Sequence, residues 1–179
     1  MEQDEPKKEK EKKSSRTVET MYRTTMANHI RLSEMADRKA GLMVSINSII
    51  ISIMTSFLVH EFATNPKLIY STIVLVIVCL LTITFALLST KPSVKHHNKK
   101  SIDKLDLLFF GDYTSISLAE YKKAMNNMME NETHLRDSLI ENIYAQGKVI
   151  DHKFRLLNIS YTIFMYGFPS AILSLIIIH

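Results

Sequence analysis

The sequence has very little glycine, proline or cysteine and no tryptophan: its 179 residues include 4 Gly, 4 Pro, 1 Cys and no Trp. So few Gly and Pro residues exclude a collagen-like chain, a flexible linker and an all-β chain with many tight turns. The single cysteine, Cys79, excludes a disulfide framework and a multi-cysteine zinc or iron–sulfur site. The absence of Trp and the 10 Met residues favour a helical protein over a β-sandwich or barrel.

Charged residues are missing from three long stretches. These are the 19 residues Gly41–Val59, the 23 residues Leu68–Thr90 and the 23 residues Leu156–Ile178. An α-helix rises about 1.5 Å per residue, so each stretch is long enough to cross a hydrocarbon core of about 30 Å. Three such stretches in so short a chain leave too little polar surface to cover them in water. The sequence therefore predicts an all-α membrane protein with three spans, at about 41–59, 68–90 and 156–178.

The distribution of lysine and arginine predicts how the spans are oriented. Residues 1–39 contain 10 basic residues and residues 91–155 contain 11, whereas the hairpin 60–67 contains one. Because cytoplasmic loops carry an excess of Lys and Arg, we expect both long polar segments in the cytoplasm and the C-terminus outside. Acidic residues number eight and nine in the same two segments, so the net charge of +4 reports topology. Neither DNA nor RNA is expected as a partner, and the basic run Lys91–Lys100 is expected to contact lipid headgroups.

The polar segments are also predicted to be helical. Residues 1–16 are a charged tail with almost nothing to bury, and we expect them to be disordered. Residues 17–179 are expected to form one domain, in which an amphipathic N-terminal helix runs into a transmembrane hairpin. The cytoplasmic part, 91–155, has a turn signal at Gly111-Asp112 and capping-box spacing between Ser117 and Glu120. From there an apolar stripe, softened at Asn142 and Gln146, predicts one long helix that leads into the third span.

No pattern of an enzyme is present. A phosphate-binding glycine loop, an H-E-x-x-H pair, a G-x-S-x-G turn and a dinucleotide fingerprint are all missing. The neighbouring His96 and His97 side chains would point apart on a helix or strand, so we expect no metal site. The three spans contain no ionisable residue of the kind that couples ions in pumps and transporters. We therefore expect no catalytic residue, no metal and no cofactor.

Small polar residues mark one face of the first span. Two interpretations are open: helix–helix packing through small polar side chains, or the lining of a pore. A pore would need a homo-oligomer, since three helices cannot enclose a water-filled channel alone. The residues are Ser45, Asn47, Ser48, Ser52 and Thr55.

Two stretches carry a resemblance to a known family. One is MYRTTMANHIRLSEMADRKAGLMVSINSIIIS, and the other is KLDLLFFGDYTSISLAEYKKAMNNMM, followed by RDSLIENIYAQGKVIDHKFRLLNISYTIFM. Together they resemble the transmembrane effectors of Pycsar, the bacterial antiphage system named for its pyrimidine cyclase. The most specific motifs are Asp37-Arg38-Lys39-Ala40, Leu107-Leu108-Phe109-Phe110-Gly111 and the helix start Leu118–Tyr121. Some relatives carry a phosphohydrolase domain ahead of this region, and here only a short charged tail occupies that place.

The resemblance implies a function that composition does not. A neighbouring cyclase would make cyclic CMP or cyclic UMP on infection, and this protein would respond by impairing the bacterial inner membrane, causing abortive infection. The alternative is a non-catalytic membrane adaptor that recruits a cytoplasmic partner through its helices.

A cyclic pyrimidine nucleotide needs cations for its phosphate and aromatic faces for its base. The same side chains have another interpretation, in which the cations contact lipid and the aromatics fill a helical core. The candidate nucleotide-binding residues are Arg31, Arg38, Lys39, Lys99, Lys100, Phe109, Phe110, Tyr113, Tyr121 and Arg155.

Overall fold

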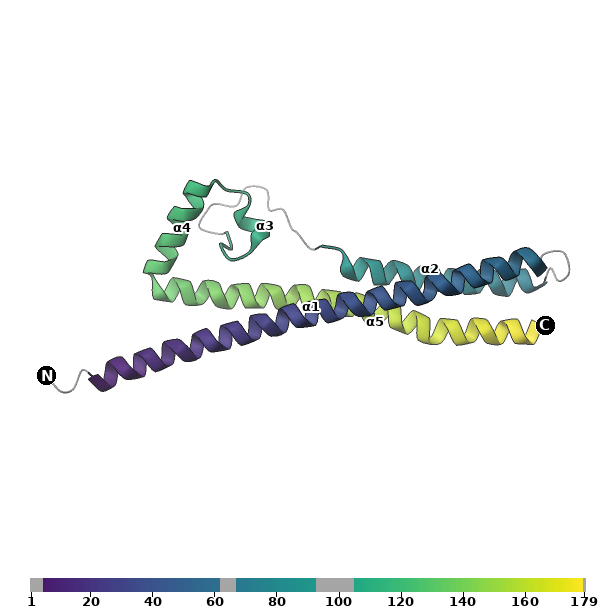
Figure 1. Ribbon diagram of the computed structural model, residues 1–179, viewed down its shortest axis with the longest axis horizontal. Coiled ribbons are helices and arrows are strands. Elements are labelled where there is room, and N and C mark those ends of the chain that lie inside the picture. Colours follow the sequence, from purple (N-terminus) through teal and green to yellow (C-terminus); the bar gives the residue numbers. More distant parts are fainter. Residues whose placement is uncertain (1–4, 62–66, 93–104, 179) are drawn as a thin grey trace. The chain divides into compact units, whose positions relative to one another are not determined.

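The structure is a computed structural model that describes residues 5–61, 67–92 and 105–178 (Figure 1). Every helix or strand in these ranges is an α-helix, which confirms the all-α prediction. The elements are α1 (Glu5–Glu61), α2 (Lys67–Thr90), α3 (Phe110–Tyr113), α4 (Leu118–Glu130) and α5 (Glu132–Ile178).

Three of these helices, α1, α2 and α5, are long and apolar enough to cross a membrane. The candidate spans lie within Arg16–Phe57, Ile69–Thr90 and Glu132–Ile177. Helices α1 and α5 have 57 and 47 residues, because in each of them a polar stretch and an apolar stretch form one continuous helix. This agrees with the expectation that an amphipathic helix leads into the first span and a cytoplasmic helix leads into the third.

Helix α1 begins at Glu5, inside the segment 1–16 for which a disordered tail is predicted. Pro6 stands in the first turn, where its missing N–H would have no partner within the helix anyway. The Lys and Glu residues that follow are good helix formers. Low hydrophobicity therefore does not prevent a helix that continues a longer one.

The long cytoplasmic helix predicted from Ser117 onward is interrupted, which corrects that prediction. The capping box itself is confirmed: the Ser117 side chain accepts from the Glu120 N–H at 3.3 Å, and the Glu120 carboxylate accepts from the Ser117 N–H at 2.9 Å. However, α4 ends at Glu130 and is followed by the C-cap Asn131, whose backbone is extended (φ −110°, ψ 100°). The Asn131 Oδ1 then accepts from the His134 N–H at 3.1 Å and caps the start of α5. Gly111 and Asp112, predicted as a turn, lie in the single helical turn α3.

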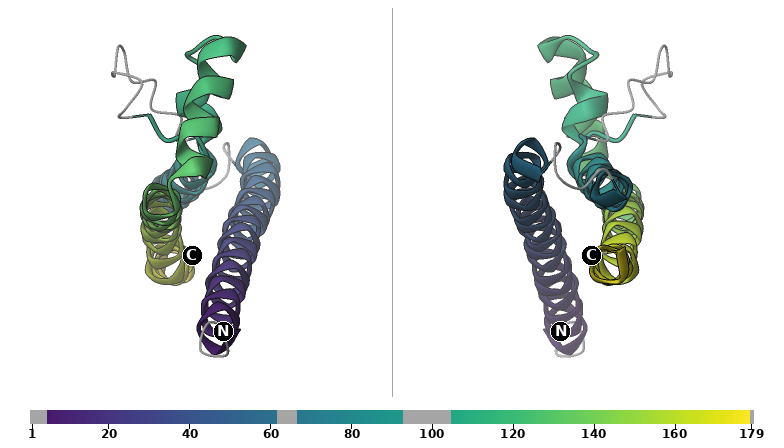
Figure 2. Two further views of the ribbon diagram at one scale, coloured as in Figure 1. Left: turned by 90° about the vertical axis from the view of Figure 1, so that its left-hand side faces the viewer. Right: turned by 90° about the vertical axis from the view of Figure 1, so that its right-hand side faces the viewer.

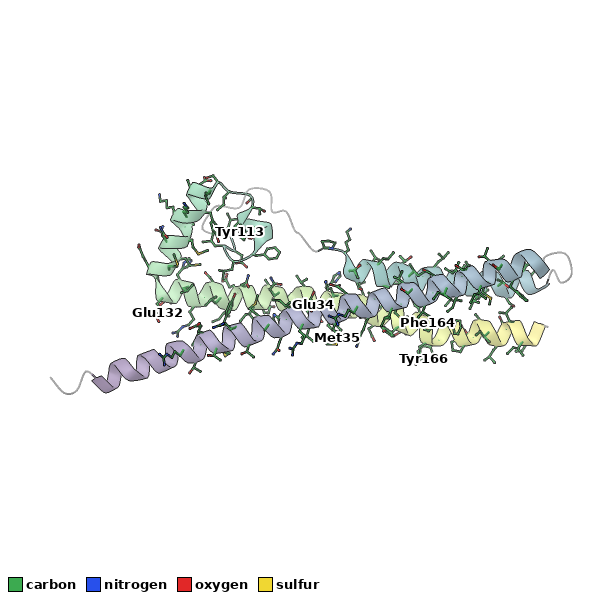
Figure 3. The ribbon with its side chains drawn as sticks, in the orientation of Figure 1. Glu34, Met35, Tyr113, Glu132, Phe164 and Tyr166 are labelled. Carbon is green, nitrogen blue, oxygen red and sulfur yellow. The ribbon has the colours of Figure 1, made fainter. Side chains whose placement is uncertain are left out.

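The chain divides into two compact units, and the boundary between them falls inside α1 and inside α5. Unit 1 consists of Met1–Arg31 and Ser93–Val149, and unit 2 consists of Leu32–Pro92 and Ile150–His179. Within unit 2, α1 and α5 run in the same direction and α2 runs opposite to them (Figure 1; Figure 2). The core that joins these three helices is made of Ala36, Ala40, Met43, Ala86 and Leu157, with Val44, Phe154, Tyr161 and Phe164 packed against it (Phe164 is labelled in Figure 3).

Candidate functional site

In unit 1, the Asp106 carboxylate organises the loop that precedes α3. Its Oδ1 accepts from the Leu108 N–H at 2.9 Å, which is a local turn typical of aspartate. Its Oδ2 accepts from the Asn142 Nδ2 of α5 at 2.9 Å. The Asp106 N–H in turn donates to the Asp112 Oδ2 at 3.2 Å. These hydrogen bonds tie the loop both to itself and to α5. The bond to Asp106 also gives a partner to Asn142, a polar residue that is 1% exposed within the apolar stripe.

Tyr22 extends this cluster to α1. Burial raises the pKa of the Tyr22 hydroxyl, and the negative charge of Asp106 raises it further. Both effects disfavour the tyrosinate, so the side chain stays protonated and neutral at physiological pH. The carboxylate that ties the loop to α5 therefore also acts electrostatically on a side chain of α1.

The loop and the start of α4 also collect aromatic rings. The Tyr113 and Tyr121 rings lie with their centroids 5.1 Å apart and their planes tilted by 44° (Tyr113 is labelled in Figure 3). The Tyr121 hydroxyl donates to the Leu107 carbonyl oxygen at 3.4 Å. The Phe109 ring covers Gly111, since a Cβ at that position would be 2.5 Å from Phe109 Cε1. Three of the predicted stacking residues are therefore gathered in this part of the chain.

The predicted cations are distributed differently. Arg31 is exposed and belongs to unit 1, where the aromatic cluster lies. Arg38, Lys39 and Arg155 are exposed in unit 2, and Arg155 pairs with Asp151 one turn earlier in α5. Among the predicted phosphate ligands that the structure describes, only Arg31 thus shares a unit with the aromatic residues. Lys99, Lys100, the histidine pair His96-His97 and the Phe110 side chain lie outside the described part.

An ion pair in unit 2 was not predicted from the sequence. The Lys153 Nζ of α5 donates to both Asp37 carboxylate oxygens of α1 at 2.9 Å and to the Ser33 Oγ at 2.9 Å. The Lys153 side chain is 13% exposed and that of Asp37 is 44% exposed. A signal was present, because Lys153 lies between Ile150 and Leu157 at the helical spacing of the buried stripe. The pair joins α1 to α5 just before the stretches predicted to span the membrane.

The polar face predicted on the first span is divided between two sides of α1, which corrects its description as one face. Asn47 is 0% exposed, and its Nδ2 donates to the Met43 carbonyl oxygen at 2.8 Å. The other four residues are exposed. Each donates its hydroxyl to the carbonyl oxygen four residues earlier, over 2.8 to 3.0 Å; they are Ser45, Ser48, Ser52 and Thr55.

These features define a class of protein: an α-helical protein with three helices apolar enough to cross a membrane, two of which, α1 and α5, also contribute residues to the polar unit 1. Within the described ranges no group of three or more His, Cys, Asp or Glu residues is placed to hold a metal ion. The chain belongs to the Pycsar effector family, since the Pycsar effector protein domain matches residues 20–178. This is a family of antiphage-defence membrane effectors that is linked to a pyrimidine cyclase and is not a known enzyme family. No curated protein and no solved structure matches the chain.

Proposed function

We propose that this protein senses a cyclic pyrimidine nucleotide, cyclic CMP or cyclic UMP, through unit 1 and impairs the bacterial inner membrane through unit 2. The observation that carries the proposal is that the family match extends across both units. The same two helices, α1 and α5, contain residues of the polar unit and of the apolar unit. A ligand that favours one arrangement of unit 1 can therefore act on helices that also belong to the spans.

The proposed topology places the N-terminus and residues 91–155 in the cytoplasm, where a cyclase product would be available. The excess of Lys and Arg in these segments supports it. With this orientation the hairpin 60–67 and the C-terminus lie outside, and the effector has three spans in the inner membrane.

For the nucleotide itself, the aromatic cluster of unit 1 supports a site near α3 and the start of α4. Phe109, Tyr113 and Tyr121 would offer ring faces to the pyrimidine. Arg31 would offer a guanidinium to the cyclic phosphate. The remaining predicted cations stay candidates for either the nucleotide or the lipid headgroups.

The proposal is tested with the full chain in liposomes loaded with a self-quenched dye. Cyclic CMP or cyclic UMP should release the dye, whereas linear CMP, linear UMP and cyclic AMP should not. Arg31→Gln should weaken the response by about tenfold or more, as expected for loss of a charged hydrogen bond. The matched control is Arg23→Gln, which removes an exposed arginine from the same helix whose partner, Glu19, is on α1 itself. Silence with both cyclic nucleotides, in vesicles with verified insertion and orientation, contradicts direct sensing.

A specific observation also supports the adaptor as a second candidate. Several large apolar side chains of unit 1 are exposed although they lie outside the predicted spans. An adaptor would use such a surface to hold a partner in the absence of nucleotide, and a homo-oligomer would use it to hold a second copy. Purification without nucleotide separates the candidates, because a stable stoichiometric partner favours the adaptor. The residues are Met21 (60% exposed), Ile30 (58%), Leu118 (68%), Met129 (56%), Ile140 (57%) and Tyr144 (67%).

A further inference from the structure

The interior of unit 2 is unusually polar for an apolar bundle. On α2 the buried residues from Thr72 onward follow one another at steps of three and four, which places them on one side of the helix. Only one of them is a large aliphatic residue, and the leucines at 80, 81, 87 and 88 point away from the bundle. The buried series is Thr72, Leu75, Cys79, Thr82, Ala86 and Ser89, each at most 3% exposed.

Near the middle of this series, each of the three helices contributes one polar residue with no exposed surface. They are Asn47 of α1, Thr82 of α2 and Ser160 of α5, all 0% exposed, and we call them the polar layer. The Ser160 Oγ donates to the Thr82 carbonyl oxygen at 2.8 Å, which joins α5 to α2. Met43 lies one helical turn before Asn47. The core cluster that contains Met43 also contains Ala86, one turn after Thr82 on α2, and Leu157, one turn before Ser160 on α5.

Each side chain of the polar layer donates a hydrogen bond, but one buried acceptor in it receives none from the described residues. The Asn47 Nδ2 donates to the Met43 carbonyl oxygen, and the Thr82 Oγ1 donates to the Val78 carbonyl oxygen at 2.8 Å. The Asn47 Oδ1 is buried and accepts no hydrogen bond from the described residues. A buried amide oxygen without a donor is unfavourable in an apolar surrounding. An arrangement of the helices that admits water to this point gains a hydrogen bond that the packed arrangement lacks.

We propose that the polar layer is a hydration gate, the point at which water first enters unit 2 when its helices separate. Packed as in this structure, the three side chains of the layer have no exposed surface. When the helices part, Asn47, Thr82 and Ser160 line a wet path. Because three helices do not enclose a channel wide enough for solutes, this path is shared between copies of the chain. The inference rests on the proposed function, and adds where in the protein the membrane is breached.

Cys79 makes the gate measurable without any substitution. It is the only cysteine, it is 0% exposed, and it lies on the same side of α2, three residues before Thr82. Thiolate formation needs water, so a charged, membrane-impermeant methanethiosulfonate reagent modifies Cys79 only if water reaches the bundle interior. In liposomes of the full chain, we expect cyclic CMP or cyclic UMP to cause dye release and Cys79 modification together. Dye release while Cys79 stays unmodified overturns the gate.

Two nearly isosteric variants and one control test the layer itself. Asn47→Leu removes the amide whose oxygen accepts no hydrogen bond from the described residues, and Thr82→Val removes the hydroxyl, so both favour the packed arrangement. Asn47→Leu should slow nucleotide-driven dye release and Cys79 modification by about tenfold, the factor that corresponds to one unsatisfied buried group. Thr82→Val should slow both in the same direction, since a valine side chain cannot bind the water that enters. Thr84→Val, which removes an exposed hydroxyl bonded within α2, should leave both rates unchanged. If both apolar variants release dye as fast as the unaltered protein, the layer serves only helix packing and the proposal is wrong.

A further variant separates failure of the gate from failure of the proposed function. Asn47→Asp places a carboxylate in the polar layer, and its ionised form requires water. At alkaline pH we expect this variant to release dye and expose Cys79 without nucleotide. If the unaltered protein is silent with both nucleotides but Asn47→Asp opens, the nucleotide assignment fails and the gate stands. If Asn47→Asp inserts normally and leaves Cys79 protected, the gate is refuted whatever the nucleotide does.

Discussion

Replacing Gly167 with alanine is expected to destabilise unit 2, because α5 approaches α2 closely at this position. A Cβ on Gly167 would lie 2.7 Å from Val78 Cγ1, 3.1 Å from Val78 Cγ2 and 3.5 Å from Val78 Cβ. Carbon atoms pack best at about 3.5 to 4.0 Å, so the first of these contacts is a clash. Valine is branched at Cβ and holds one χ1 rotamer in a helix, so it cannot turn its methyl group away. Either the two helices move apart or the strain remains.

The expected magnitude follows from two opposing effects. Inserting a methyl group into a packed site costs about 1–3 kcal/mol. Alanine in place of glycine favours the helix by about 1 kcal/mol. The net loss for Gly167→Ala is therefore about 1 kcal/mol, and up to about 2 kcal/mol if the helices cannot move apart. Gly41 is a matched control on α1, since a Cβ there meets nothing within 4 Å. Gly41→Ala should be neutral or stabilise the helix by up to about 1 kcal/mol.

The free energy of unfolding can be compared by titrating the variants in mixed micelles with SDS and following far-ultraviolet circular dichroism. Shortening the opposing residue provides the decisive check. Val78→Ala should be harmful alone but should relieve most of the penalty when combined with Gly167→Ala, so that the two changes are not additive. Equal stability of the Gly41→Ala and Gly167→Ala proteins, or strict additivity with Val78→Ala, would refute the packing argument.

Three further predictions concern polar contacts. Asp37→Ala should lower the free energy of unfolding by about 2 kcal/mol, because it leaves the nearly buried Lys153 ammonium without its ion-pair partner. Lys153→Met should lower it by about 1 kcal/mol or less, because the Asp37 carboxylate remains partly hydrated. Equal losses in the SDS titration contradict this. Ser117→Ala should reduce the helix content of α4. Hydrogen bonds from the Ser117 side chain and backbone lower the pKa of Glu120, so their contribution is present at neutral pH and lost as the pH falls through that lowered pKa. This acid loss of circular dichroism should be smaller in the variant, which keeps only the backbone hydrogen bond. Asn142→Leu should cost about 2 kcal/mol and speed protease cleavage of the loop before α3, because the loop loses its charged hydrogen bond to α5; an unchanged cleavage rate speaks against the anchor.

The features that could be predicted from the sequence are those encoded locally. Three uncharged runs predict the long apolar helices, and the capping box at Ser117 depends on residues three positions apart. The break at Asn131 was missed because apolar spacing continues across it, although asparagine is a common helix cap. The bonds between Asp106 and Asn142 and between Lys153 and α1 join residues 36 and 116 positions apart. Such pairs depend on which helices lie side by side, and a single sequence does not encode that directly.

The two sides of α1 differ in what they require of their surroundings. Outward, hydroxyls such as those of Ser48 and Ser52 are bonded to carbonyl oxygens of their own helix, so they can face lipid at little cost and need no partner. Exposure of these hydroxyls therefore gives no reason to prefer a pore over simple contact with lipid or another copy. Inward, Asn47 is fully buried with an unbonded oxygen, which neither lipid contact nor close packing satisfies. If α1 has a side that is suited to water, it is the inward one, and Cys79 lies where opening of that side can be detected.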